Sequence, residues 1–375
     1  MFAERELTNK FNGMQRQWLI RTYLLCLVSL FYSLPTFAQN DSSVSQKSFF
    51  SQRSFGKYFL ADIYSPFTKL QAGAGLNLRE YNINTNRKAL YVFYNETDLA
   101  VEVPIYSATW LNRRRQQTRL AISIPVSTNI WFDFTEQITA PILNTDYRFA
   151  LVELNVLREL NRRHLKNVAL KLIPFFHEST HLGDELVINR VSSALPITRV
   201  NISYEVAEAA LTLNDPNGRA ENNHAFKIGV RALLNPSKGW YSIRSVEGDT
   251  TKVVPSRRWA EQYAQYQYQQ VRGWLASRNA WFILSLEVRN RVQFGYPFYL
   301  NSSTVSDPSL LNEIQNNEQR RLCFNGYMGW KFSSNSANIP RLGAYLRAYT
   351  GLNPHGQFRN IPFYQFLGLS IVYEN

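Results

Sequence analysis

Apolar and polar residues alternate over stretches of about ten residues along most of this chain. In residues 280–288, even-numbered positions such as Phe282 and Leu284 are apolar, and the odd-numbered positions from Ser285 onward are polar. A period of two residues predicts a β-strand with one apolar and one polar face. The same pattern predicts further strands at residues 71–81, 89–94, 99–110, 118–126, 147–154, 168–177, 185–191, 199–213, 224–234, 322–332, 341–350 and 363–373.

The number and length of these strands indicate the fold class. They are about a dozen, and they run for roughly 9 to 13 residues, whereas strands of globular proteins usually have about 5 to 6. Long amphipathic strands are typical of a transmembrane antiparallel β-barrel. A secreted β-sandwich is the alternative, and it fits less well because sandwiches prefer shorter strands and often need disulfides. We predict an all-β fold, a barrel of about 12 strands over residues 69–375.

The N-terminus predicts export. Basic residues, among them Lys10, Arg16 and Arg21, precede the apolar run 23–32. Thr36 and Ala38 provide the small residues of a signal-peptidase site, so residues 1–38 are predicted to be a cleaved signal peptide. An uncleaved anchor is the alternative, but this run is short for a span of about 20 residues. No later apolar run reaches 18 residues, which excludes a helical membrane protein. Cys323 would then be the only cysteine of the mature chain.

Residues 39–68 are predicted to form a short periplasmic N-terminal segment, which includes residues 49–59. Two polar inserts, residues 247–277 and 301–321, are predicted to be extracellular loops. The first contains a stretch rich in Tyr and Gln, residues 257–274, which suits a helix and either a surface contact or a solvated loop.

The chain carries a formal charge of +13 and groups basic residues at 113–115, 162–163 and 257–258. Such groups can attract lipopolysaccharide phosphates or favour anions in a pore, and more often they are solvated turn residues. For an exported barrel we expect no nucleic-acid partner. The expected partners are outer-membrane lipids, lipopolysaccharide and the barrel insertion machinery, and the expected location is the outer membrane.

The segment FFHESTHLGDE, residues 175–185, concentrates the residues that could do chemistry. In a strand, His177, Ser179 and His181 would project from one face. His177 could act as the base for a nucleophilic Ser179, with backbone amides near Thr180 as oxyanion donors. The group that orients the imidazole would follow in the sequence, at Asp184, Glu185 or Asn189.

Two other interpretations of this segment remain open. Imidazole and carboxylate groups together suit zinc or a similar divalent ion, so His177, His181, Asp184 and Glu185 could bind a metal. The two histidines could share the ion only if the strand turned near Thr180. Otherwise no cofactor is expected. In the third interpretation, the polar cluster is structural and the segment ends in a turn at residues 183–184.

The direction in which the segment faces bears on the hydrolytic interpretation. Lys171 should avoid the hydrocarbon, because a lysine at the bilayer midplane costs about 2–4 kcal/mol. His177 and Ser179 share the parity of Lys171, so regular alternation places them in the lumen. A bulge at Pro174 would reverse that placement.

The pair His177 and Ser179 resembles the HxS motif of the outer-membrane phospholipase A and lipid A deacylase barrels. That resemblance implies acyl hydrolysis at the outer leaflet, with both side chains facing lipid. More of the chain resembles a bacterial family known as domain of unknown function 1207. The resembling segments are FLADIYSPFTKLQAG (59–73), NTDYRFAL (144–151), HESTHLGDE (177–185), NISYE (201–205) and GLNPHGQF (351–358). This second resemblance implies an exported outer-membrane barrel and no particular activity.

The sequence therefore predicts an outer-membrane barrel of structural, ligand-binding or pore type as its leading function. A lipid or lipopolysaccharide acyl hydrolase that uses Ser179 and His177 is the alternative.

Overall fold

The computed structural model describes residues 43–50, 58–76, 91–111, 116–134, 142–160, 162–183, 200–218, 220–244, 251–277, 279–296, 308–332 and 341–374. The predicted signal peptide, residues 113–115 and residues 184–199 lie outside these ranges. Among the described residues, no helix has the length and apolar character needed to cross a membrane.

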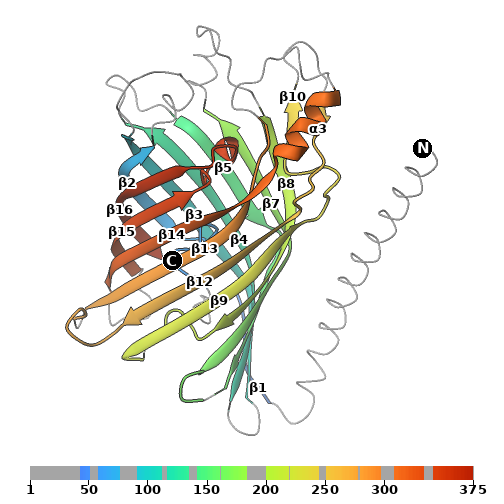
Figure 1. Ribbon diagram of the computed structural model, residues 1–375. Helices are drawn as coiled ribbons and strands as arrows, with labels where there is room; N and C mark the ends of the chain where they lie inside the picture. The colour runs from blue at the N-terminus through green and yellow to red at the C-terminus, as the bar shows by residue number, and fades with distance from the viewer. Residues whose placement is uncertain are drawn as a thin grey trace.

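The described strands close into an antiparallel β-barrel of twelve wall strands (Figure 1). β16 pairs with β2 and closes the wall, and β5 and β6 together form one wall strand between β4 and β7. The wall consists of β2 (Thr68–Leu76), β3 (Tyr91–Leu111), β4 (Gln117–Asp133), β5 (Ile142–Ala150), β6 (Glu153–Glu159), β7 (Asn167–Leu182), β8 (Val200–Leu213), β9 (Asn222–Leu233), β12 (Ala260–Gln270), β13 (Ala280–Gln293), β14 (Gln319–Phe332), β15 (Arg341–Gly351) and β16 (Tyr364–Glu374). The predicted fold class is confirmed.

The two ends of the barrel differ in the length of their connections. At one end, here called the turn end, short connections such as 160–166 and 214–221 join the strands. At the other, the loop end, longer connections such as 183–199 and 234–259 do so, and the helix α3 (Pro308–Asn317) and the short strands β10 (Ser242–Arg244) and β11 (Thr251–Val253) lie there. α3 and β10 stand together at the top of Figure 1.

One sequence prediction is wrong here. Residues 260–270, predicted as part of a polar loop that suited a helix, form wall strand β12, which pairs with β9 and β13. The strand alternates Gln265, Gln267 and Gln269, which are buried in the lumen, with outward tyrosines. Because glutamine alternates with tyrosine in this strand, it lacks the stripe of aliphatic residues from which the other strands were predicted.

The two faces of the wall differ as the alternation predicts. The outer face exposes large apolar side chains, among them Leu70, Phe93, Val101, Phe226, Ile228, Val230, Leu286, Val288, Phe324, Met328, Trp330, Leu346, Leu367, Leu369 and Ile371. The inner face carries charged side chains that pair with one another, such as Lys331 with Glu374 at 2.6 Å and Arg289 with Glu287 at 2.8 Å. Buried charges need partners of this kind, because an unpaired one would be costly.

Two segments fold into the lumen. Residues 58–67, here called the plug, place Asp62 3.4 Å from Arg289 and 3.8 Å from Lys227. The plug backbone is held as well, because Ser285 Oγ accepts a hydrogen bond from the Ala61 amide at 3.0 Å. Residues 352–361 enter from the loop end, and there Arg359 pairs with Glu261.

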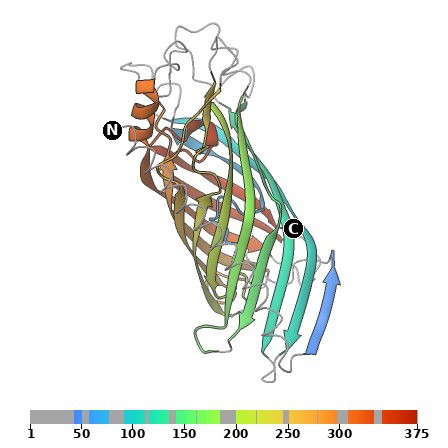
Figure 2. The same ribbon diagram turned by 90° about the vertical axis from the view of Figure 1, so that its right-hand side faces the viewer.

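The filled lumen leaves little open volume at its centre. A cavity of about 20 Å³ lies between plug and wall, lined by residues that include Ile63, Lys69 and Glu96. That is room for about one water molecule. The plug lies within residues 39–68, and the strand β1 (Ser43–Phe49) of the same segment pairs with the turn end of β3, beside the barrel (Figure 2).

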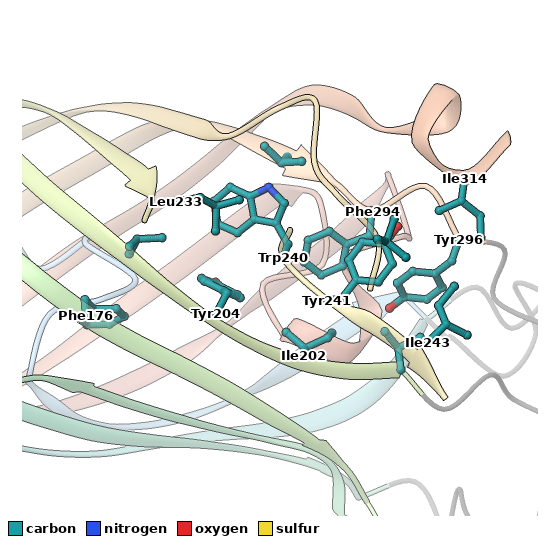
Figure 3. Close-up of a cluster of buried hydrophobic side chains, with 14 of the residues drawn as sticks. Phe176, Ile202, Tyr204, Leu233, Trp240, Tyr241, Ile243, Phe294, Tyr296 and Ile314 are labelled. Atoms are coloured by element: carbon teal, nitrogen blue, oxygen red, sulfur yellow. The ribbon is translucent and has the colours of Figure 1, made fainter. Parts of the chain in front are cut away.

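At the loop end, beside β7 and β8, the lumen also contains an apolar cluster. Figure 3 shows Phe176, Ile202 and Tyr204 of the wall packed in one cluster with side chains of the loop-end connections. Trp240 and Phe294 belong to that cluster. In this part of β7 and β8, the apolar side chains therefore face inward.

Candidate functional site

A β-bulge in β7 decides which way the segment 175–182 faces. Ile173 pairs with Glu208 of β8, and Phe176 pairs with Val206, so Pro174 and Phe175 together stand opposite the single residue Ala207. The extra residue reverses the alternation. Lys171 and Ile173 are buried on the inner side before the bulge, and even-numbered residues are buried after it.

The predicted lumenal placement of His177 and Ser179 is therefore wrong. Glu178 and Thr180 take the inner positions, where Glu178 accepts a hydrogen bond from Tyr204 Oη at 2.7 Å and Thr180 donates one to Asn144 Oδ1 at 2.9 Å. His177 and Ser179 point out of the barrel. Pro174 has no backbone N–H to give to a neighbouring strand, which is why the ladder tolerates an irregularity there.

On the outer face, His177 is paired with a carboxylate that the sequence reading did not select. Glu205 lies directly across the ladder on β8, and its Oε1 is 3.3 Å from Nδ1 of His177. Both side chains are accessible, His177 to 21% and Glu205 to 34%. With the proton on Nδ1, the ring donates to Glu205 and keeps the lone pair of Nε2 free to accept a proton.

The same pairing continues toward the loop end. Ser179 stands opposite Ser203 of β8, and His181 follows on the outer face. On the other side of β7, Tyr147 stands opposite Ser179 and Phe149 opposite His177. The ring centroids of Phe149 and His177 are 5.3 Å apart, and those of Tyr147 and His181 are 5.5 Å apart. Polar groups thus form a patch with an aromatic border.

This patch departs from the apolar character of the outer face. A carboxylate and an imidazole that face lipid are costly unless they pair, and ionisable groups in such positions commonly mark functional sites. His177 lies five residues before Leu182, where β7 ends (182 − 177 = 5). The patch is therefore near the loop end of the wall. We call His177, Ser179, His181, Ser203 and Glu205 the outer polar patch.

The three orienting residues predicted from sequence, Asp184, Glu185 and Asn189, lie outside the described residues. The metal hypothesis stays untested for the same reason, because its carboxylates are Asp184 and Glu185. Within the described ranges, no group of three or more His, Cys, Asp or Glu residues is arranged to hold a metal ion. Cys323 is a free, buried thiol.

Two of the predicted basic clusters can be placed. Arg162 and Arg163 are exposed at the turn end, and Arg257 and Arg258 are exposed at the loop end. The backbone amides of Arg257 and Arg258 donate to Glu318 just after α3. All four lie in connections, as the solvated-turn interpretation expects.

Fold and patch together define the class: a closed, antiparallel twelve-stranded β-barrel of the outer-membrane type, with a filled lumen and a polar patch on its outer face. No protein-family model matches the sequence, and no curated protein matches it, so the resemblance to the uncharacterised family stays a prediction.

Solved structures with a similar architecture are outer-membrane barrels. The Salmonella typhi outer membrane phospholipase dimer with bound calcium is 11% identical, with 87% of this chain and 95% of that chain covered and a TM-score of 0.41. The translocator domain of the autotransporter NalP from Neisseria meningitidis is 8% identical, with coverage of 82% and 86% and a TM-score of 0.34. OprD of Pseudomonas aeruginosa is 9% identical, with coverage of 87% and 98% and a TM-score of 0.28. At such identities the likeness concerns barrel architecture alone.

Proposed function

We propose that this protein is an outer-membrane acyl hydrolase that cleaves ester bonds of membrane lipids at the outer polar patch. In this proposal the loop end faces outward from the cell and the turn end faces the periplasm, as the long and short connections of outer-membrane barrels do. The patch then meets the outer leaflet.

The observation that carries the proposal is the outward His177–Glu205 pair next to Ser179. Glu205 fixes the imidazole and stabilises its positive charge, His177 Nε2 takes the proton, and Ser179 Oγ attacks, which is the division of roles in a serine hydrolase triad. A lipid ester reaches Ser179 from the side, through the membrane. A base and its nucleophile often come within hydrogen-bond distance only when substrate binds.

The filled lumen disfavours the pore that the sequence also allowed. Plug and wall share buried ion pairs and hydrogen bonds, and the central cavity has room for about one water molecule. A purely structural role would leave the outward carboxylate without a reason, because an apolar pair at that position would suit the lipid better.

The test measures fatty-acid release by refolded, full-length protein from phospholipid and, separately, from lipid A, with and without divalent ions. We expect wild type to release fatty acid and Ser179→Ala to lose more than about 1000-fold, since the nucleophile is gone. Ser277→Ala, an exposed serine in the turn-end connection between β12 and β13, is the control. Absence of release from wild type on both substrates refutes the hydrolase.

A further inference from the structure

We propose that Ser203 supplies the hydroxyl that stabilises the oxyanion formed during attack by Ser179. The inference rests on the proposed hydrolase and adds a catalytic residue to it. It follows from two observations: what the barrel wall does with its backbone amides, and what stands opposite Ser179.

The backbone near Ser179 has no donor to spare. β7 pairs with β5 on one side, where Ser179 faces Tyr147, and with β8 on the other, where it faces Ser203. In a strand that has two partners, each N–H belongs to one ladder or the other. The backbone amides near Thr180, which the sequence analysis predicted as oxyanion donors, are therefore hydrogen-bonded within the sheet. A side chain must then donate the hydrogen bond to the oxyanion.

Ser203 is the side chain best placed to do it. Residues directly opposite in an antiparallel pair have Cβ atoms about 4.5–5.5 Å apart, so a carbonyl bonded to Ser179 Oγ comes within hydrogen-bond reach of Ser203 Oγ. Tyr147, on the opposite flank, packs its ring against His181, toward the loop end. Ser203 is exposed on the outer face, where lipid would otherwise favour an apolar residue.

The reaction balances with these groups. Ser179 Oγ bonds to the acyl carbon, its proton passes to His177 Nε2, and the carbonyl π electrons move onto oxygen, to which Ser203 donates. Collapse of this intermediate breaks the ester C–O bond, and the leaving alcohol takes the proton from Nε2. Water, deprotonated by His177, then cleaves the acyl-Ser179 ester by the same route and releases the fatty acid and free Ser179.

The experiment compares Ser203→Ala and Ser203→Thr with wild type, using kcat and KM for a lipid ester and the rate at which a fluorophosphonate labels Ser179. Loss of one oxyanion donor from an accessible site should lower kcat roughly 10- to 100-fold, leave KM within about twofold, and slow labelling in parallel. Ser203→Thr keeps a hydroxyl and should recover most of the rate. Asn201→Ala, one exposed position away on the same face of β8, is the control.

The outcomes separate the two levels of the argument. If Ser179→Ala is inactive and Ser203→Ala keeps wild-type kcat, the role of Ser203 is refuted and the hydrolase stands. If wild type neither hydrolyses lipid nor takes label at Ser179, both proposals fall. If Ser203→Ala loses heat modifiability on gels, Ser203→Thr decides: a folded threonine variant whose kcat is about 10-fold or more below that of wild type also refutes the role.

Discussion

Replacing Glu205 by glutamine tests the electrostatic basis of the proposed site. Glutamine keeps an oxygen that can accept a hydrogen bond from His177 Nδ1 and removes only the negative charge. In the wild type, Nδ1 and Glu205 Oε1 are 3.3 Å apart. When His177 takes the proton of Ser179 it becomes an imidazolium, and the carboxylate stabilises that charge. The substitution should therefore act on the transition state.

The size of the effect follows from the separation and the exposure. Two unit charges 3.3 Å apart attract by about 5 kcal/mol at an effective dielectric constant near 20, and by about 1.3 kcal/mol in water. Glu205 is 34% exposed, so its surroundings lie between these limits. A loss of about 2–3 kcal/mol corresponds to roughly 30- to 160-fold in kcat.

The assay is fatty-acid release under saturating lipid, with folding checked by heat modifiability on gels. Glu205→Ala removes the acceptor as well as the charge and should cost more than Glu205→Gln. Glu221→Gln, an exposed carboxylate in the turn-end connection before β9, should leave the rate unchanged. A rate for Glu205→Gln within twofold of wild type, in a protein that Ser179→Ala inactivates, refutes the role given to this carboxylate.

Two further predictions concern the lumen and the bulge. Reconstituted wild type should pass no ionic current across planar bilayers, because the plug fills the lumen. Replacing residues 58–67 by a Gly/Ser stretch of equal length removes the buried ion pairs of the plug and should produce stepwise ionic currents. Steady currents through wild type would contradict this prediction. Deleting Pro174 leaves Phe175 alone opposite Ala207, so His177 stays outward and hydrolysis should be preserved. One alanine inserted between Phe176 and His177 turns His177 and Ser179 inward and should abolish hydrolysis. Equal rates of hydrolysis for these two variants would contradict the role given to the bulge.

Most of the wall could be predicted from the sequence, because a period of two is a local property. Residues 280–288 are read correctly for that reason. β12 was missed because glutamine and tyrosine occur on both of its faces, so no apolar stripe marks the strand. The lumenal position of the plug could not be predicted, since it depends on contacts between residues more than two hundred positions apart, such as Ala61 and Ser285.

The candidate site was predicted in part. His177 and Ser179 stood out as neighbours on one face, but their direction depended on whether Pro174 creates a bulge, and Glu205 is set 28 positions from His177. The sequence of β8 contained a signal for the outward direction of His177 and for the position of Glu205. NISYEV alternates with the same period as β7, and its apolar members Ile202 and Tyr204 join the loop-end cluster inside the barrel. The usual assignment of apolar residues to lipid fails there.

The bulge at Pro174 and Phe175 amounts to a phase slip in a periodic signal. Odd-numbered residues of β7 face inward up to Ile173, and even-numbered residues do so from Phe176. When the apolar–polar periodicity is averaged over all of β7, the two halves have opposite phase and cancel. Substitution tolerance along β7 should change phase at the same point, because the outward positions are even-numbered before the bulge and odd-numbered after it.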